Sequence, residues 1–182
     1  MKKIHLIRHA KSSWKDDSLA DIDRPLNKRG KKSCLFMAQH ILEAGCCFDQ
    51  VFCSPAVRAQ LTIELISNSL EEVDIQWQTE ELLYTFDSDT VLDWCRTVDE
   101  SITELVIIGH NPALTDFCNE LSNSNLKNIP TCGYAQLTYG KSGKKCQWRK
   151  LAEGSAELTA FLRPKKLMKQ ENGKKNTSNN TG

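Results

Sequence analysis

The chain has 182 residues, of which 40% are hydrophobic and 26% are charged, and its formal net charge is +1 at pH 7. These values are typical of one globular domain and exclude a largely disordered body. No apolar run approaches the roughly 20 residues of a membrane-spanning helix, and the balanced charge argues against a nucleic-acid surface, so we expect neither membrane nor nucleic acid as a partner.

Apolar periodicity predicts that strands and helices alternate in the first half of the chain. Asn27 is expected to cap the first helix, and Ser54 is expected to cap the second, with Pro55 at its first position. The predicted elements are a strand over residues 3–7, a helix from Asn27 to Ala44, a strand over 50–53, a helix from Pro55 to about Leu70, and a strand over 73–77.

The second half continues this alternation and then changes to a hairpin. The apolar run 104–109 is the most strand-like in the chain, and its composition is typical of a strand buried on both faces. The other predicted elements are a helix capped by Ser88, a helix around residues 114–121, and two strands near 134–139 and 146–151 joined by a turn at residues 140–143.

Alternating strands and helices predict an α/β fold with three layers, in which helices cover both faces of a mostly parallel central sheet. The stretch between Leu70 and Glu104 has room for only about one strand and one helix at typical element lengths. We therefore expect no large lid insertion over a site at the carboxyl edge of this sheet.

The carboxyl-terminal segment differs in composition from the rest. From Pro164 onward there are five lysines and one acidic residue, Glu171, which gives a net charge of +4. Residues 168–182 have no apolar period, so we expect a disordered tail after a domain of residues 1–167. Its charges recruit an acidic partner or keep the protein in solution, and the second hypothesis is favoured.

The amino-terminal residues and the cysteines bear on the location of the protein. Residues 1–8 have too few apolar residues for a signal peptide, so we expect a cytoplasmic protein. Reducing compartments keep thiols free, and the eight cysteines include no Cys-x-x-Cys pair. We interpret them as packing thiols and expect no metal site.

Four residues with phosphate chemistry stand at or just beyond the ends of predicted strands. Arg8 and His9 follow the first strand, Arg58 follows the second by one helical turn, and His110 follows the strand over 104–109. Arginine holds phosphate oxygens with paired hydrogen bonds, and a neutral imidazole is a competent nucleophile. Each residue alone is more often a capping, core or surface group, but together they form a set suited to phosphate.

The sequence resembles the histidine phosphatase superfamily, which includes the cofactor-dependent phosphoglycerate mutases, and within it the bacterial phosphohistidine phosphatases. The resemblance spans the body and rests on five segments in order: Leu6-Ile7-Arg8-His9-Ala10-Lys11-Ser12-Ser13-Trp14, residues 23–30, Cys53-Ser54-Pro55-Ala56-Val57-Arg58-Ala59, residues 106–114, and Arg163-Pro164-Lys165-Lys166-Leu167. It implies a phosphoglycerate mutase-like fold.

The resemblance also implies roles for individual residues. His9 is the expected nucleophile, which takes the phosphoryl group to give a phosphohistidine enzyme that water hydrolyses. Arg8, Arg58 and His110 are expected to surround the phosphate, with Ser12 as a further donor or a plain turn residue. This mechanism needs neither a metal nor another cofactor.

Members of the superfamily that cleave esters carry an acidic proton donor, and this sequence does not clearly reproduce it. Glu80 and Glu81 are the nearest candidates, although they also fit an ordinary solvated loop, and Asp23 is expected instead to order Arg24. An alkoxide leaving group needs protonation, whereas imidazole leaves more easily. The missing acid therefore favours a substrate with a P–N bond.

The leading hypothesis is a phosphatase whose substrate is a phosphohistidine-containing protein, such as a histidine-phosphotransfer domain or a phosphocarrier. A small-molecule phosphomonoesterase of the same superfamily is the second. A third, from another class, is a non-catalytic phosphate-binding module, against which His9 argues because recognition alone needs no nucleophile. A metal site built from cysteines is the least favoured.

Overall fold

A computed structural model describes residues 1–140 and 146–178, and within them the strands and helices alternate largely as the sequence predicts. The strands are β1 (Lys2–Arg8), β2 (Val51–Cys53), β3 (Trp77–Thr79), β4 (Glu104–Gly109), β5 (Tyr134–Tyr139) and β6 (Ala156–Leu162). The helices are α1 (Lys28–Glu43), α2 (Val57–Ser69), α3 (Ser88–Thr97), α4 (Ala113–Ser122) and α5 (Pro164–Ser178).

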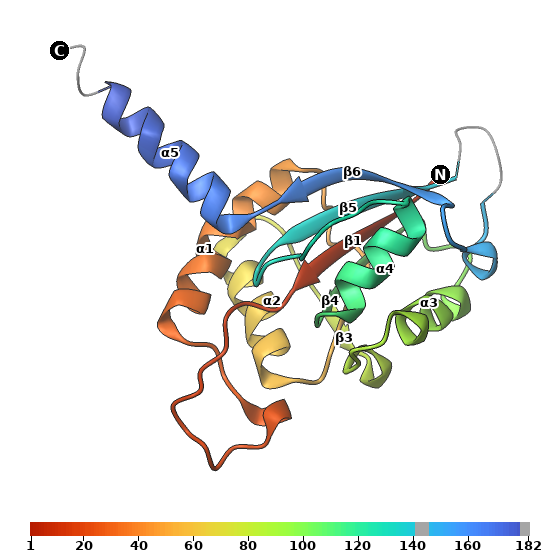
Figure 1. Cartoon of the computed structure of the whole chain (residues 1–182), viewed down its shortest axis with the longest axis horizontal. Coiled ribbons are helices and arrows are strands. Elements are labelled where there is room, and N and C mark those ends of the chain that lie inside the picture. Colours follow the sequence, from red (N-terminus) through yellow and green to blue (C-terminus); the bar gives the residue numbers. More distant parts are fainter. Residues whose placement is uncertain (141–145, 179–182) are drawn as a thin grey trace.

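The strands form one sheet in the order β3-β2-β4-β1-β5-β6, shown in Figure 1. The first four are parallel, whereas β5 pairs antiparallel with β1 and β6 pairs antiparallel with β5. Because β1 and β4 are neighbours, Arg8 stands opposite Gly109 at the same edge of the sheet. The predicted mostly parallel sheet is confirmed.

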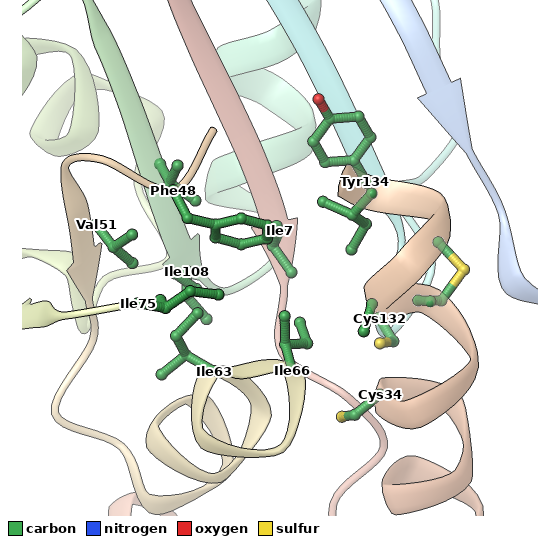
Figure 2. Close-up of a cluster of buried hydrophobic side chains, with 14 of the residues drawn as sticks. Ile7, Cys34, Phe48, Val51, Ile63, Ile66, Ile75, Ile108, Cys132 and Tyr134 are labelled. Carbon is green, nitrogen blue, oxygen red and sulfur yellow. The ribbon is translucent and has the colours of Figure 1, made fainter. Parts of the chain in front are cut away.

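Two hydrophobic clusters occupy the two faces of the sheet. One lies under α1 and α2 and contains Ile7, Ile63, Ile66 and Ile108, which Figure 2 shows pointing toward one another. The other lies under α3 and α4 and is built on the alternate residues of the strands. Burial on both faces explains why residues 104–109 are uniformly apolar. The three-layer α/β/α fold is confirmed, and no large lid separates α2 from β4.

The start of α1 packs against the loop that follows β1. Asn27 caps the helix as predicted, since its side chain accepts a hydrogen bond from the Gly30 amide at 2.8 Å. Its own amide donates to the Lys11 carbonyl at 3.0 Å. A Cβ at Gly30 would clash with that carbonyl oxygen, so only glycine lets the helix approach the loop this closely.

Three predicted boundaries in the first hundred residues are wrong by a few positions. Helix α2 begins at Val57 rather than Pro55, and the Ser54 hydroxyl is hydrogen-bonded to His110. Strand β3 lies at Trp77–Thr79, beyond the predicted 73–77, in register with β2. The cap of α3 is Asp87 rather than Ser88, because the Asp87 carboxylate accepts from the Thr90 amide.

The predicted second strand of the hairpin is also wrong. Residues Trp148–Lys150 form a short 3-10 helix, and the strand that pairs with β5 is Ala156–Leu162. Trp148 is fully buried, and its ring nitrogen donates to the Ile102 carbonyl at 2.9 Å. Because the Trp148 side chain is anchored in the core, residues 148–150 turn instead of continuing as the predicted strand. The predicted turn lies mostly outside the described residues, which omit 141–145.

The disorder expected from residue 168 onward is not found as far as residue 178, which belongs to α5. Pro164 opens this helix, where proline is favoured, and Leu167 packs against the core beside α1. Glu171 lies 3.1 Å from His40 of α1. These contacts hold the first turns, and the rest of α5 extends away from the body (Figure 1). Within the described part of the chain, no helix has both the length and the apolar character needed to span a bilayer.

Candidate active site

His9 stands at the carboxyl end of β1, where backbone hydrogen bonds fix its position from both sides. Its amide donates to the Gly109 carbonyl at 3.1 Å, and its carbonyl accepts from the Cys132 amide at 3.2 Å. The ring Nδ1 lies 2.8 Å from the Ala10 carbonyl, which can only accept, so Nδ1 carries the proton. The lone pair of Nε2 is therefore available to a phosphorus atom.

The surroundings of His9 keep its imidazole neutral. Burial lowers the pKa of His9 to about 4, although the hydrogen bond to Ala10 opposes the shift, and the charges of Arg58, Arg8 and Arg24 lower it further. At neutral pH the ring is consequently an unprotonated base with one nitrogen free. A nucleophile requires this state.

His110 faces His9, with 5.0 Å between the two ring centroids. Its Nδ1 accepts a hydrogen bond from the Arg58 guanidinium at 3.3 Å, so its Nε2 carries the proton and donates to the Ser54 hydroxyl at 2.8 Å. Burial lowers the pKa of His110 to about 3, and the neighbouring His9 and Arg58 add to this shift. Ser54 thus holds one edge of the ring while the other faces the arginine.

Arg58 lies in the first turn of α2 and is 3% exposed. Its Nη1 donates to the Asp21 carbonyl oxygen at 2.5 Å and its Nη2 donates to the Asp21 carboxylate at 2.9 Å. The Tyr84 hydroxyl donates to the same carboxylate at 2.9 Å. Burial raises the pKa of Asp21, but the hydrogen bonds from Tyr84 and Arg58 outweigh it and lower the pKa overall, so the carboxyl is ionised.

Arg8 enters the site from β1 and is held by acceptors on the segment before β5. Its Nη1 donates to the Asn128 side-chain oxygen at 3.0 Å and to the Ile129 carbonyl at 2.9 Å. Its Nε is buried and has no hydrogen-bond partner among the described residues. An unsatisfied buried donor is costly, and an anion in the cleft would satisfy it.

Ser12 lies on the loop after β1, and its hydroxyl accepts a hydrogen bond from Arg24. Arg24 also donates to the Asp21 carboxylate at 3.1 Å. The guanidinium carbon lies 3.4 Å from the centroid of the Trp14 ring, as in a cation–π contact. Arg24 is thereby a third arginine at the site, and the sequence motifs did not single it out as one.

These side chains surround an open cleft of about 390 Å³. Its lining includes four of the five predicted residues, His9, Arg8, Arg58 and Ser12, while the fifth, His110, contacts His9 and Arg58. The exposed rings of Trp14 and Phe86 form part of the rim. The structure therefore brings together the four residues predicted from strand ends, and Ser12 joins them.

The three acidic candidates do not lie in this cleft. Glu80 caps the 3-10 helix Glu81–Leu83, since its carboxylate accepts from the Leu82 amide, and Glu81 is exposed. Asp23 is exposed as well, and the acid that orders Arg24 is Asp21 rather than Asp23. The spacing of Asp21 and Arg24, three residues apart in a tight turn, is the signal that favours Asp21.

The cysteines are free thiols dispersed through the molecule, and six of the eight are buried. In the part of the chain that the structure describes, no three His, Cys, Asp or Glu side chains gather as metal ligands would. Cys132 and Cys34 lie in the core cluster under α1, where Figure 2 shows both side chains. Packing accounts for these residues.

Comparison with known proteins identifies the family. A model of the histidine phosphatase superfamily (branch 1) matches residues 4–89. The uncharacterized protein ML1117 of Mycobacterium leprae is 30% identical over 171 residues, which are 87% of this chain and 100% of the relative. The chain therefore belongs to the histidine phosphatase superfamily, and its enzyme class is phosphatase.

Solved structures share the fold. The structure named as the putative phosphohistidine phosphatase SixA from Nakamurella multipartitia has a TM-score of 0.74 at 22% identity, covering 90% of this chain and 96% of that one. The protein histidine phosphatase SixA complexed with tungstate has a TM-score of 0.72 at 20% identity, covering 91% and 99%. A mycobacterial glucosyl-3-phosphoglycerate phosphatase has a TM-score of 0.61 at 11% identity, covering 88% and 98%. The predicted phosphoglycerate mutase-like architecture is confirmed.

Proposed function

We propose that this phosphatase removes phosphoryl groups from phosphohistidine in a cytoplasmic signalling or phosphotransfer protein, with His9 as the nucleophile. The observation that carries the proposal is the composition of the cleft. A neutral imidazole with a free Nε2 stands among arginines, and the one lining carboxylate, Asp21, is ionised and hydrogen-bonded to Arg58. This set binds and attacks a phosphoryl group but offers no ready acid to a leaving alkoxide.

The first step transfers the phosphoryl group to His9. The Nε2 lone pair forms a bond to phosphorus while the P–N bond to the substrate imidazole breaks. A substrate ring that carries a proton on its other nitrogen leaves as neutral imidazole, so this step needs no proton from the enzyme. In the second step a water oxygen bonds to phosphorus, the bond to His9 breaks, and inorganic phosphate is released.

Stabilisation of the transferring group falls to the cations. In the transition state, negative charge lies on the three equatorial oxygens of the phosphoryl group and requires fixed hydrogen-bond donors. Arg8 and Arg58 provide these donors. The Nδ1 of His110 faces the Arg58 guanidinium because Ser54 holds its Nε2. A bound phosphate favours protonation of that nitrogen, which then donates as well. Ser12 and Arg24 complete the ring of donors.

The shape of the rim supports a protein substrate. The cleft is uncovered, and the side chains of Trp14 and Phe86 on its rim are 73% and 53% exposed. Exposed aromatic groups of this kind are enriched at protein interfaces. A histidine-phosphotransfer domain or a phosphocarrier presents its phosphohistidine on a surface that can reach such a site.

Trapping the phosphoenzyme tests the nucleophile. After mixing with a radiolabelled phosphohistidine protein and rapid quenching in alkali, we expect label on the enzyme that is stable to base and labile to acid. His9→Ala should retain its melting temperature and show neither label nor turnover. Label that persists in His9→Ala would overturn the role of His9.

The substrate class is tested by comparing leaving groups at saturation. We expect kcat on a phosphohistidine protein to exceed kcat on 3-phosphoglycerate, with an aryl phosphate between them, because the ranking follows leaving-group ability. Efficient cleavage of 3-phosphoglycerate that is lost in Asp21→Asn would instead identify Asp21 as a general acid. That result would establish a small-molecule phosphomonoesterase.

A further inference from the structure

A second concave surface, which we call the basic groove, lies beside the active-site cleft. It has a volume of about 560 Å³ and runs between the start of α1, the segment before β5, and the start of α5. Helix α1 contributes Arg29 and Lys32, and α5 contributes Lys165, Lys166 and Lys169. Among the side chains that the structure describes, Arg163 and Lys11 bring the number of lining cations to seven, and none of the lining residues is acidic.

The positive charge of the groove is uncompensated. In the described portion of the chain, none of its seven cations forms an ion pair, although other lysines and arginines do. The nearest acid on α5, Glu171, pairs with His40. Excluding Pro164 and the residues after it, the chain carries a net charge of −3, so this concentration of charge is local.

The lysines of α5 stand on a helix whose first turn is anchored to the body rather than on a free tail. Pro164 is buried, Leu167 packs against the core, and the amides of Lys166 and Leu167 both donate to the Arg163 carbonyl, at 3.0 and 3.1 Å. An anchored backbone fixes where these side chains begin, which lowers part of the entropy lost when a ligand binds.

The groove also has an apolar component. Pro130, Pro164 and Met168 line it between the charged groups. A nucleic-acid backbone presents phosphates and sugars, which are polar and would leave these apolar side chains without an apolar partner. An amphipathic polypeptide segment with acidic and apolar side chains matches both parts, and methionine adapts well to a peptide partner.

The groove and the active-site cleft adjoin each other. Lys11 and Thr131 line both, and Lys11 is only two residues from His9. A polypeptide that places a phosphohistidine in the cleft therefore positions its neighbouring residues over the groove. Binding of substrate residues in the groove would therefore help to place the phosphohistidine in the cleft.

We propose that the basic groove binds an acidic, amphipathic segment of the phosphoprotein next to its phosphohistidine. This inference rests on the proposed function, because it assigns the groove to the same substrate. The interaction is electrostatic at long range, so it weakens as salt rises and the Debye length falls to about 8 Å at physiological ionic strength.

A pair of matched peptides tests this inference. Both carry one chemically phosphorylated histidine, flanked by glutamates and leucines in one peptide and by glutamines and leucines in the other. At low salt we expect the wild-type kcat/KM to be about tenfold higher for the acidic peptide, mainly through KM. Equal values for the two peptides would overturn the proposal.

Substitutions in the groove provide the second arm. The variant Lys32→Gln/Lys166→Gln/Lys169→Gln changes exposed side chains outside the cleft. It should lose the preference for the acidic peptide and retain full activity on the glutamine peptide and on an aryl phosphate. The control Lys127→Gln/Arg149→Gln/Lys150→Gln removes as many exposed charges away from the groove and should keep the preference. A groove variant that keeps it would overturn the proposal.

Direct binding separates this inference from the proposed function. If neither phosphopeptide is hydrolysed while an aryl phosphate is, the proposed substrate fails, and binding of the unphosphorylated acidic peptide then tests the groove alone. Binding that is lost in the groove variant supports an acidic polypeptide ligand. No binding by the wild type, or tighter groove-dependent binding of a DNA duplex, would overturn the inference.

Discussion

The carboxylate and the carbonyl of Asp21 both accept hydrogen bonds from the guanidinium of Arg58, at 2.9 and 2.5 Å. In the free enzyme an internal acceptor thus occupies the paired donors that a phosphate would use. Arg58 is oriented and its buried charge is neutralised before substrate arrives. A phosphoryl group binds by displacing or sharing this partner.

Removing the charge of Asp21 should strengthen anion binding. Asp21→Asn keeps the backbone acceptor but lowers the negative potential in the cleft, so we expect the inhibition constant of inorganic phosphate to fall about tenfold. Asp23→Asn, two residues away and outside the cleft, is the matched control and should not change it. Weaker inhibition in Asp21→Asn would contradict the idea that Asp21 competes with phosphate.

The free enzyme should keep His9 neutral well below pH 6. Because burial lowers its pKa to about 4, the ring should bind a proton only as the pH falls to that value. An NMR titration of the His9 ring, assigned with His9→Gln, measures the midpoint directly. A midpoint near the ordinary value of about 6.5 would contradict the described environment.

The same burial makes stability depend on pH. In the unfolded chain a histidine takes up a proton near pH 6.5, whereas folded His110 does so only near pH 3. The contribution of His110 to stability is therefore fully present above about pH 6.5 and is lost, by roughly 1.4 kcal/mol per pH unit, as the pH falls from there toward 3. Chemical unfolding of His110→Gln should show a shallower acid loss than the wild type, and parallel curves would contradict this.

Arg58 should not be replaceable by lysine. An ammonium group cannot make the planar pair of hydrogen bonds, so Arg58→Lys should lower kcat/KM by about 10²-fold or more. Activity on an aryl phosphate and circular dichroism, measured together, separate this effect from misfolding. Arg149→Lys, at an exposed position outside the cleft, should behave as wild type. Wild-type kinetics in Arg58→Lys would remove Arg58 from the phosphate site.

Gly30→Ala should disturb the loop that follows β1 although alanine favours helices. The added Cβ clashes with the Lys11 carbonyl, which is backbone and cannot rotate away, so we expect about 1–3 kcal/mol of destabilisation and reduced kcat. Gly173→Ala is the matched control, since a Cβ there meets no atom of the described side chains and backbone within 4 Å. Unchanged stability and activity in Gly30→Ala would show that the loop can adjust.

Sequence patterns sufficed for the part of the site that the sheet positions. Arg8 and His9 follow one parallel strand and His110 follows its neighbour, so chain direction alone brings them to the same edge. The position of Arg58 could be predicted in the same way, because it lies one helical turn after β2, the strand next to β4. These positions required only the location of the apolar runs.

The remaining features depend on contacts that have no period in the sequence. Asp21 and Asp23 are equivalent by composition, and only the turn that directs Asp21 toward Arg58 distinguishes them. Ser54 is a residue type that often caps helices, but here its hydroxyl is hydrogen-bonded to His110, which follows the neighbouring strand. Burial of Trp148 against the Ile102 carbonyl displaced the last strand from its predicted position.

Strand β1 is hydrogen-bonded along its length to β4 on one side and β5 on the other, so His9 is attached to the most constrained strand of the sheet. Asp21, Arg24 and Trp14 instead lie on the long connection between β1 and α1. The ring of His9 and the side chains of Asp21, Arg24 and Trp14 are thus carried by segments that differ in how tightly the sheet holds them. Substitutions on this connection should therefore change the groups around Arg58 while β1 keeps the position of His9.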